Sequence, residues 1–293
     1  MLDPFVIARP FAARLKRRLR RWRANRIDYG AMVADLDPTT ISQEAAVTFQ
    51  CNLCGSRNST ALAQLSREAR SCNACGSTVR LRALARLVVR EVLELDVPLH
   101  ELANHRYVTG LGLSDVAAFA RPLSEKFSYE NTWFHTEPKL NIADVPPERF
   151  GRYDFVIASD VFEHVAPPVS RAFENARRLL KPGGKFIFTV PFSLEPDTVE
   201  HFPDLHDWSI AECNGLWQLT NTTLAGQRQS FDNLIFHGGP GTTLEMRLFS
   251  RAGLEREFAS AGFARVRVAA EPYLPFGIHW PQPYSVPMVA YAT

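Results

Sequence analysis

The pattern of apolar and polar positions is most regular over residues 153–192. Two short apolar runs, at 155–158 and 186–190, are rich in β-branched and aromatic residues, as in strands that are covered on both faces. Between them, apolar residues recur at helical spacing over 169–180, with charged residues opposite. The basic turn, proline and two glycines at 181–184 are typical of a helix end. The pattern predicts a strand, a helix and a parallel strand joined by a right-handed crossover.

Three polar residues follow the first of these strands, namely Asp160, Glu163 and His164. Ligands of open α/β sheets bind outside the carboxyl ends of the strands, so we expect chemistry at this position. The strand-end acidic pair and the helix-LLKPGG-strand pattern resemble the second half of class I S-adenosylmethionine-dependent methyltransferases of type 11. The resemblance implies a Rossmann-like α/β core with a mostly parallel sheet and helices on both faces.

The resemblance implies in-line transfer of a methyl group from the sulfonium of S-adenosylmethionine to a nucleophile. Asp160, Glu163 and His164 are the catalytic candidates, with His164 as a base or acceptor contact. The alternative is that the Glu-His pair serves the cofactor pocket or the local structure. No Asn-Pro-Pro-Tyr sequence is present, so we expect an oxygen nucleophile, on a sugar or another small polar acceptor.

The cofactor half of the core is expected to begin near residue 106. The resemblance implies that Gly110 and Gly112 follow the first strand, where the backbone passes close to the cofactor. Asp115 either binds the cofactor amine or caps the next helix. The sequence departs from the family here, because the third glycine and the preceding acidic residue are missing.

Two further acidic residues are candidates for cofactor binding. Glu137 follows a strand-like segment at 132–135 and matches the residue that accepts hydrogen bonds from the ribose hydroxyls. Asp144 resembles the later acidic residue near the adenine amino group. Both also suit turn or capping roles beside prolines. The interval from Gly112 to Asp144 is short, so we expect one helix-strand unit of the family's core to be missing or reduced.

The cysteines form a second pattern. Four of the five lie in CNLCG and CNACG, two Cys-x2-Cys pairs separated by seventeen residues, namely Cys51, Cys54, Cys72 and Cys75. Two such turns can supply four thiolates to a structural Zn²⁺ and leave no open position for catalysis. Disulfides are less favoured because no secretory signal is evident, and a redox role would not explain the duplication. Cys213 is expected to be an ordinary cysteine.

An amphipathic segment follows the second cysteine pair directly, at 77–93. Ser77 or Thr78 is its expected N-cap. Four arginines line its other faces and are expected to be solvated or to bind an anionic substrate, namely Arg80, Arg82, Arg86 and Arg90. The order of CxxCG pairs, arginine-rich helix start and methyltransferase core resembles bacterial methyltransferases with N-terminal zinc modules. We therefore assign 49–78 to a zinc ribbon and 79–293 to the core.

Residues 1–26 form a basic arm with nine Lys or Arg against one Asp, which leaves the remainder of the chain at −6. Apolar residues at helical spacing give the arm one narrow apolar face, and residues 27–48 are assigned to a linker. The arm could be solvated or docked on a partner, could lie on an anionic membrane surface through residues 9–26, or could bind nucleic acid, which is less favoured. No apolar run reaches the ~20 residues of a membrane span. We expect a cytoplasmic protein, peripheral at the inner face of the membrane if the arm binds lipid.

The segment at about 193–236 lacks periodicity and is expected to be an insertion that shapes the acceptor pocket. Beyond it, a helix capped by Ser250 should end at Gly262 and precede an alternating strand at 263–268. Two rival classes stay open. One is a zinc-ribbon nucleic-acid-binding protein or RNA methyltransferase, and the other is a degenerate assembly subunit with the methyltransferase fold.

Overall fold

The centre of the fold is a six-stranded sheet with the order β15-β16-β6-β5-β3-β4, seen in a computed structural model that describes residues 43–293. The strands β4, β3, β5 and β6 are parallel, whereas β16 and β15 are antiparallel. The bounds are β3 (His105–Leu113), β4 (Phe127–Thr132), β5 (Tyr153–Ser159), β6 (Leu180–Thr189), β15 (Arg265–Val268) and β16 (Met288–Tyr291).

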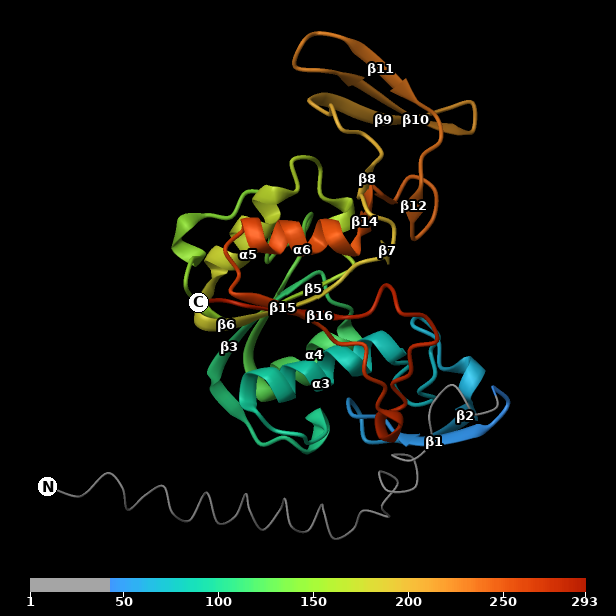
Figure 1. Cartoon of the computed structure of the whole chain (residues 1–293), viewed down its shortest axis with the longest axis vertical. Helices are drawn as coiled ribbons and strands as arrows, with labels where there is room; N and C mark the ends of the chain where they lie inside the picture. Colours follow the sequence, from blue (N-terminus) through green and yellow to red (C-terminus); the bar gives the residue numbers. More distant parts are fainter. Residues whose placement is uncertain (1–42) are drawn as a thin grey trace, which may run out of the picture. The chain divides into compact units, whose positions relative to one another are not determined.

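Helices cover both faces of this sheet (Figure 1). One face carries α3 (Val79–Leu93) and α4 (Ala117–Lys126), and the other carries α5 (Ser170–Leu179) and α6 (Arg251–Ser260). Each side has its own apolar core, which explains why the central strands lack polar alternation. The expected Rossmann-like α/β architecture with a mostly parallel sheet is confirmed.

The predicted strand, helix and parallel strand are β5, α5 and β6. The four residues at 181–184 loop out of the pairing, because Tyr153 pairs with Leu180 and Phe155 already pairs with Lys185. Two predicted helix starts are also confirmed. Thr78 caps α3 by accepting from the N–H of Leu81, and Ser250 caps α6 by accepting from that of Gly253.

The second parallel strand lies earlier than expected. β4 ends at Thr132, so the strand expected at 132–135 is wrong, and Trp133 and Phe134 are partly exposed beyond the strand. The expectation of a missing helix-strand unit is confirmed. Between β4 and β5 the described chain contains only the 3₁₀ turn η3 (Pro147–Arg149), and β4 is the edge of the sheet.

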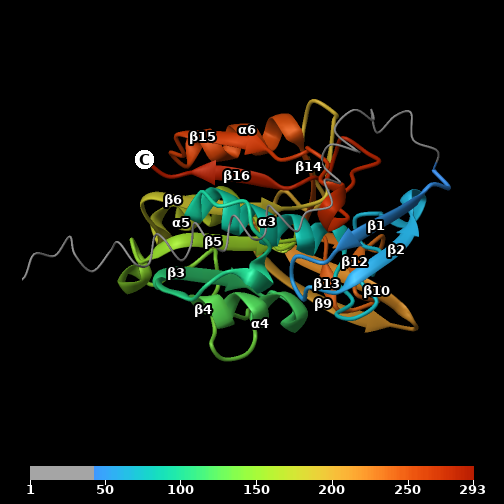
Figure 2. The same cartoon turned by 90° about the horizontal axis from the view of Figure 1, so that it is seen from below.

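The cysteine-rich segment contains the hairpin of β1 (Ala46–Gln50) and β2 (Arg57–Ala61), then η1 (Leu62–Gln64), and continues without a linker into α3. β1 packs against the turn η5 (Leu274–Phe276) near the end of the chain (Figure 2). The basic arm and all but the last residues of the expected linker lie outside the described residues. Among residues 43–293, no helix is long and apolar enough to cross a membrane.

The insertion is built from β-structure. Its main part is the antiparallel sheet β9 (Asp207–Cys213), β10 (Leu216–Thr222) and β11 (Arg228–Phe231), which stands away from the central sheet (Figure 1). Shorter strands flank it, namely β7 (Phe192–Ser193), β8 (Val199–Glu200), β12 (Phe236–His237), β13 (Thr243–Leu244) and β14 (Arg247–Ser250). The remaining 3₁₀ turns are η2 (Leu99–Glu101) and η4 (Phe162–His164).

Candidate functional site

A pocket of about 1110 Å³ lies at the carboxyl ends of the parallel strands. Its wall combines residues that follow β3, β4, β5 and β6 with β9, the 237–246 segment and the cysteine-rich segment. The lining includes Arg67, Leu113, Ser114, Thr132, Trp133, Phe134, Asn141, Asp160, His164, Pro191, Trp208, Ile210, His237 and Leu244. Polar groups at strand ends and an apolar wall make this pocket the candidate active site.

Asp160 stands at the first turn after β5, with a left-handed backbone at φ 56°. Arg67 donates two hydrogen bonds to its carboxylate, at 2.5 and 2.9 Å, and Arg80 forms an ion pair with it at 3.2 Å. The Thr189 hydroxyl donates a further bond of 3.0 Å. Burial opposes ionisation, but the hydrogen bonds and charges of the two arginines hold the pKa of Asp160 below its ordinary value. The carboxylate is therefore charged and fully engaged.

Glu163 and His164 lie next to Asp160 on the turn η4. Glu163 is fully buried, and neither carboxylate oxygen has a hydrogen-bond partner among the described residues. Burial, and then the negative charge of Asp160, raise its pKa well above the ordinary value. The Nδ1–H of His164 donates to the carbonyl of Leu244 at 2.8 Å, and burial lowers the pKa of this imidazole. His164 is neutral, with a lone pair at Nε2.

The two glycines lie inside β3 and not after it, which corrects their expected place. A side chain at Gly110 would strike the ring of Phe155, and one at Gly112 would strike the Tyr129 hydroxyl and the carboxylate of Asp115. Both glycines thus permit close packing beside the strand. Asp115 is buried two residues after the end of β3, where Tyr129 donates a hydrogen bond to it and burial raises its pKa to about 7.

The other two acidic candidates lie in the loop between β4 and η3. Glu137 is exposed, and its carboxylate accepts a hydrogen bond from the N–H of Lys139 at 2.9 Å. Asp144 follows a turn in which its N–H donates to the carbonyl of Asn141. Neighbouring residues of both line the pocket, namely Thr136 and Ala143. The loop therefore borders the pocket, and Glu137 and Asp144 are each one residue away in sequence from a lining residue.

The four cysteines of the CxxCG pairs converge. Their Sγ atoms all lie within 4.8 Å of one another, and the pairs Cys51–Cys75, Cys54–Cys72 and Cys72–Cys75 are 3.7, 3.7 and 3.5 Å apart. Sulfurs at the corners of a Zn²⁺ tetrahedron with bonds of about 2.3 Å are about 3.8 Å apart. None of the described cysteines forms a disulfide. The spacing suits four ligands of one tetrahedral ion.

Hydroxyl groups lie beside sulfurs of this cluster. The Ser77 hydroxyl lies 3.2 Å from the sulfur of Cys51, and the Ser56 hydroxyl lies 3.1 Å from that of Cys72. Burial raises the pKa of the Cys51 thiol, whereas for Cys72 backbone N–H groups and the Ser56 hydroxyl outweigh burial and lower the pKa to about 6. Cys213 is exposed at the end of β9, far along the chain from this cluster.

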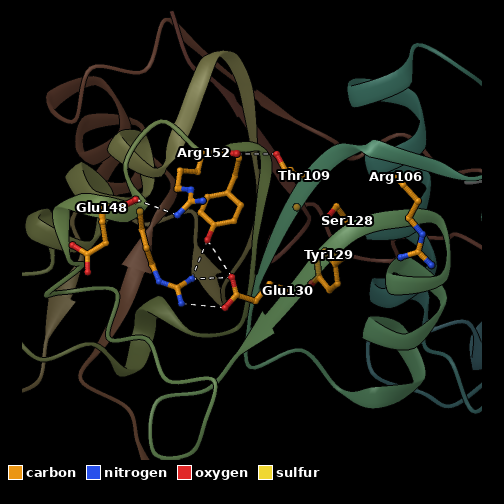
Figure 3. Close-up of a pocket in the computed structure, with 10 residues that line it drawn as sticks. Arg106, Thr109, Ser128, Tyr129, Glu130, Glu148 and Arg152 are labelled. Atoms are coloured by element: carbon orange, nitrogen blue, oxygen red, sulfur yellow. Dashed lines mark hydrogen bonds and ion pairs between the residues drawn. The ribbon is translucent and has the colours of Figure 1, made fainter.

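A second pocket, of about 570 Å³, lies beside the first half of β5 and is lined by residues of β3, β4 and η3 (Figure 3). Two of its charged groups bind each other. Arg149 donates to both carboxylate oxygens of Glu130, at 2.9 and 3.1 Å, and the Tyr153 hydroxyl bonds to the same carboxylate at 3.2 Å. Hydrogen bonds from Arg149 lower the pKa of Glu130. These contacts brace the edge of the sheet, away from the strand ends.

A family model described as "Methyltransferase domain" matches residues 75–268, which is more than half of the chain. The chain belongs to this methyltransferase family. The match begins at Cys75 and runs through α3, the strand ends and α6 as far as β15, so it includes the lining of the large pocket except Arg67 and Glu68. The protein is accordingly a methyltransferase, and the resemblance of residues 153–192 is confirmed at this level. No curated protein matches the chain.

Solved structures similar to this methyltransferase include three enzymes of low identity. The sugar N-methyltransferase KedS8 from Streptoalloteichus is 16% identical, with 74% of this chain and 89% of that chain covered and a TM-score of 0.43. CalS10, an amino pentose methyltransferase from Micromonospora echinaspora with S-adenosylmethionine bound, is 12% identical, with coverage of 74% and 93% and a TM-score of 0.40. An S-adenosylmethionine-dependent methyltransferase from Clostridium acetobutylicum is 12% identical, with coverage of 72% and 90% and a TM-score of 0.39.

Several pocket residues of this methyltransferase were not singled out from the sequence. Arg67 enters from the cysteine-rich segment, Trp133 follows β4, and His237, which pairs with Glu245, comes from the end of the insertion. Only His237 carried a local signal, since a histidine precedes the Gly-Gly-Pro-Gly turn. The remaining residues reach the pocket only because segments that are distant in sequence contact one another in the fold.

Proposed function

We propose that this methyltransferase transfers a methyl group from S-adenosylmethionine to an oxygen atom of a small polar acceptor, such as a sugar. The observation that carries the proposal is the pocket of about 1110 Å³ at the carboxyl ends of the parallel strands. Ligand pockets commonly measure ~300–1,000 Å³, so there is room for the cofactor and a small acceptor together. The residues after β3 and β4 would hold the cofactor, and the insertion would face the acceptor.

The wall after β3 and β4 fits the chemistry of the cofactor. Ser114 turns the backbone at φ 60° directly after β3. Trp133 and Phe134 are 37% and 53% exposed and offer aromatic faces for the adenine ring. Glu137 and Asp144 are next in sequence to the lining residues Thr136 and Ala143, and they would serve the ribose hydroxyls and the adenine amino group. Arg67 and Glu68 also line the pocket, where they form an ion pair with each other.

The acceptor half of the pocket is framed by the insertion. Trp208 and Ile210 of β9 line it together with His164 and His237. Aromatic faces and imidazole groups at a partly exposed rim suit a small polar molecule. When bound, S-adenosylmethionine supplies an electrophilic methyl group. The protein's part is to hold an acceptor oxygen in line with that methyl, and such positioning contributes up to ~7–11 kcal/mol in well-oriented systems.

We further propose that the four cysteines bind one structural Zn²⁺. The sulfur spacing and the neighbouring hydroxyl groups support this reading. Because four thiolates complete the tetrahedron, the ion would stabilise the ribbon and take no part in methyl transfer. Metal analysis of the purified protein should give one zinc per chain. A protein that is fully folded without zinc would contradict this assignment.

Calorimetric titration with S-adenosylmethionine and S-adenosylhomocysteine tests the main proposal. We expect one site per chain, with micromolar affinity. Absence of binding at high micromolar concentration would refute the enzyme assignment and favour a non-catalytic assembly subunit. If binding is present, the acceptor class is found by screening sugars and other hydroxyl compounds for release of S-adenosylhomocysteine.

Substitution of two tryptophans distinguishes the cofactor half of the pocket from the acceptor half. Trp133 and Trp208 are each 37% exposed and line the same pocket. Stacking of a base on an aromatic ring contributes ~1–3 kcal/mol, so Trp133→Ala should weaken cofactor binding by roughly 5- to 150-fold. Trp208→Ala should leave cofactor binding unchanged. Equal effects of the two substitutions would contradict the proposed arrangement.

A further inference from the structure

The acceptor half of the pocket contains a cluster of one carboxylate and two imidazoles. One ligand atom from each of Glu163, His164 and His237 lies within 4.8 Å of the other two. The Nε2 atom of His164 faces the Glu163 Oε1 atom at 3.7 Å, and the rings of His164 and His237 meet edge to face at 4.8 Å between centroids. A distance of 3.7 Å is too long for a hydrogen bond. The three side chains thus bring their ligand atoms close together without forming hydrogen bonds to one another.

The carboxylate of Glu163 lacks the partner that its environment demands. The residue is fully buried, and both oxygens are without a hydrogen-bond partner in the described part of the chain. The neighbouring carboxylate of Asp160 cannot supply a proton donor, and its arginines are bound to Asp160 itself. Two buried carboxyl oxygens without a partner are costly, and coordination of a cation is one way to satisfy them.

Both histidines are oriented as metal ligands commonly are. The Nδ1–H of His164 donates to the carbonyl of Leu244 at 2.8 Å, which leaves Nε2 with a lone pair. The Nε2 of His237 lies 2.8 Å from a carboxylate oxygen of Glu245, whose other oxygen bonds to His201 at 2.9 Å. If Nε2–H donates there, Nδ1 of His237 keeps its lone pair. Imidazoles that bind metals typically donate their second nitrogen to a carbonyl or carboxylate in this way.

Hydrogen bonds also hold the turn η4, which carries Glu163 and His164, in place. Arg247 is fully buried and donates to the carbonyls of Phe162 and Val165, on either side of the Glu-His pair. The N–H of Met246 donates to the carbonyl of Glu163 at 2.8 Å. These bonds fasten η4 to the 244–247 segment, so the carboxylate and the imidazoles are held in place before any ligand arrives.

We propose that Glu163, His164 and His237 bind a divalent transition-metal ion of the Mn²⁺ or Zn²⁺ class, which holds the acceptor oxygen. Ligand atoms bound at about 2.1 Å to one ion lie at most about 4.2 Å apart, so small side-chain rotations complete the set. A mixed carboxylate and imidazole set favours such ions over Ca²⁺. Three protein ligands leave positions open for an acceptor hydroxyl.

This role of the ion rests on the proposed methyl transfer to oxygen. A hydroxyl bound to the ion becomes more acidic and releases its proton to water in the pocket. The oxygen then forms a bond to the methyl carbon, and the carbon–sulfur bond breaks with its electron pair left on sulfur. The products are the methyl ether, S-adenosylhomocysteine and one proton, so atoms and charge balance.

The test is Mn²⁺ binding to the full-length protein loaded with one Zn²⁺ per chain, measured by the loss of the electron paramagnetic resonance signal of free Mn²⁺. Thiolates favour zinc over manganese, so the four-cysteine cluster does not interfere. We expect one Mn²⁺ per chain for the wild type, and at least tenfold weaker binding for Glu163→Gln and His237→Ala. The control is His135→Ala, an exposed histidine that lines the same pocket outside the cluster and should leave Mn²⁺ affinity unchanged.

Unfolding curves of each variant show that it is folded, and Mn²⁺ should raise the unfolding temperature of the wild type but not of Glu163→Gln. The proposal is overturned if the wild type binds no stoichiometric Mn²⁺, or if both cluster variants bind it like the wild type. Titration with S-adenosylmethionine on the same samples separates the two proposals. Cofactor binding without Mn²⁺ binding refutes the metal site alone, and Mn²⁺ binding without cofactor binding refutes the methyltransferase site alone.

Discussion

Replacement of Arg82 by methionine should strongly destabilise the protein. Arg82 is fully buried and donates five hydrogen bonds, to the carbonyls of Ser77, Phe276 and Gly277 and to the hydroxyls of Ser71 and Ser77. Its guanidinium also lies 4.6 Å from the ring centre of Phe49. One side chain therefore joins the ribbon, α3 and the turn η5.

The magnitude follows from the acceptors that Arg82→Met leaves behind. Each buried acceptor without a partner costs about 1–3 kcal/mol, and three of the five acceptors are carbonyls. Some will find water or a neighbouring donor, so we expect a loss of about 3–5 kcal/mol, the usual effect of removing one partner from a buried charged network. Since domains are stable by only ~5–15 kcal/mol, this is a large fraction of the total.

Urea unfolding followed by circular dichroism measures this loss, and release of zinc to a coloured chelator reports on the ribbon. Arg82→Lys keeps the charge but cannot reproduce the fork of donors, so it should fall between the wild type and Arg82→Met. The control is Arg90→Met on the same helix, whose side chain is 47% exposed. It should change stability by no more than about 0.5 kcal/mol. A loss under about 1 kcal/mol for Arg82→Met would refute the reasoning.

Three further outcomes are expected. Cys72→Ser should lower zinc content and stability together, measured by metal analysis and thermal unfolding; unchanged zinc content would contradict the assignment. Gly112→Ala should cost about 1–3 kcal/mol, because the added methyl group strikes the Tyr129 hydroxyl, and a neutral effect in urea unfolding would count against this packing role. The pKa of Asp115 in the folded protein is raised to about 7, so between about pH 4 and 7 the folded chain retains a proton that the unfolded chain releases. The stability of the wild type relative to Asp115→Asn should therefore fall as the pH rises from about 4 to 7. Equal pH profiles of the two proteins in urea unfolding would rule this out.

The sequence predicts the parts of the fold whose signals are local. The apolar runs of β5 and β6, the amphipathic α5 and the caps Thr78 and Ser250 each depend on residues a few positions apart. The short interval after Gly112 likewise predicts the absence of one helix-strand unit. The strand β16 was missed, because its four residues follow a proline-rich segment and show no alternation.

The arginines of α3 show where local patterns fail. At the sequence level Arg80 and Arg82 occupy polar faces of an amphipathic helix, and solvation is the expected state. Instead, Arg80 binds Glu68 and Asp160, and Arg82 is buried among carbonyls from residues 194 and 195 positions away. No periodicity within the helix carries information about those partners.

The candidate site likewise contains residues that the sequence predicts and residues that it does not. Asp160 and His164 line the predicted pocket because the end of a parallel strand fixes their place. The glycines were placed wrongly because β3 extends to Leu113, beyond the point at which a Gly-x-Gly pair usually ends a strand. His237 and Glu245 reach the site only through the β-structure that closes the insertion, whose sequence has no regular period.

The ribbon contributes directly to the pocket, and this gives its stability a functional consequence. Arg67 lies only five residues before Cys72, and its guanidinium holds the carboxylate of Asp160 while its Nε donates to the carbonyl of Ser285 at 2.8 Å. Loss of the ribbon would withdraw this arginine and leave Arg80 as the remaining cation on a nearly buried carboxylate. Because the Asp160 turn leads straight into Glu163 and His164, disorder there would spread to the acceptor end of the pocket. A structural ion in the ribbon would therefore act on the candidate active site through Arg67, without touching a substrate.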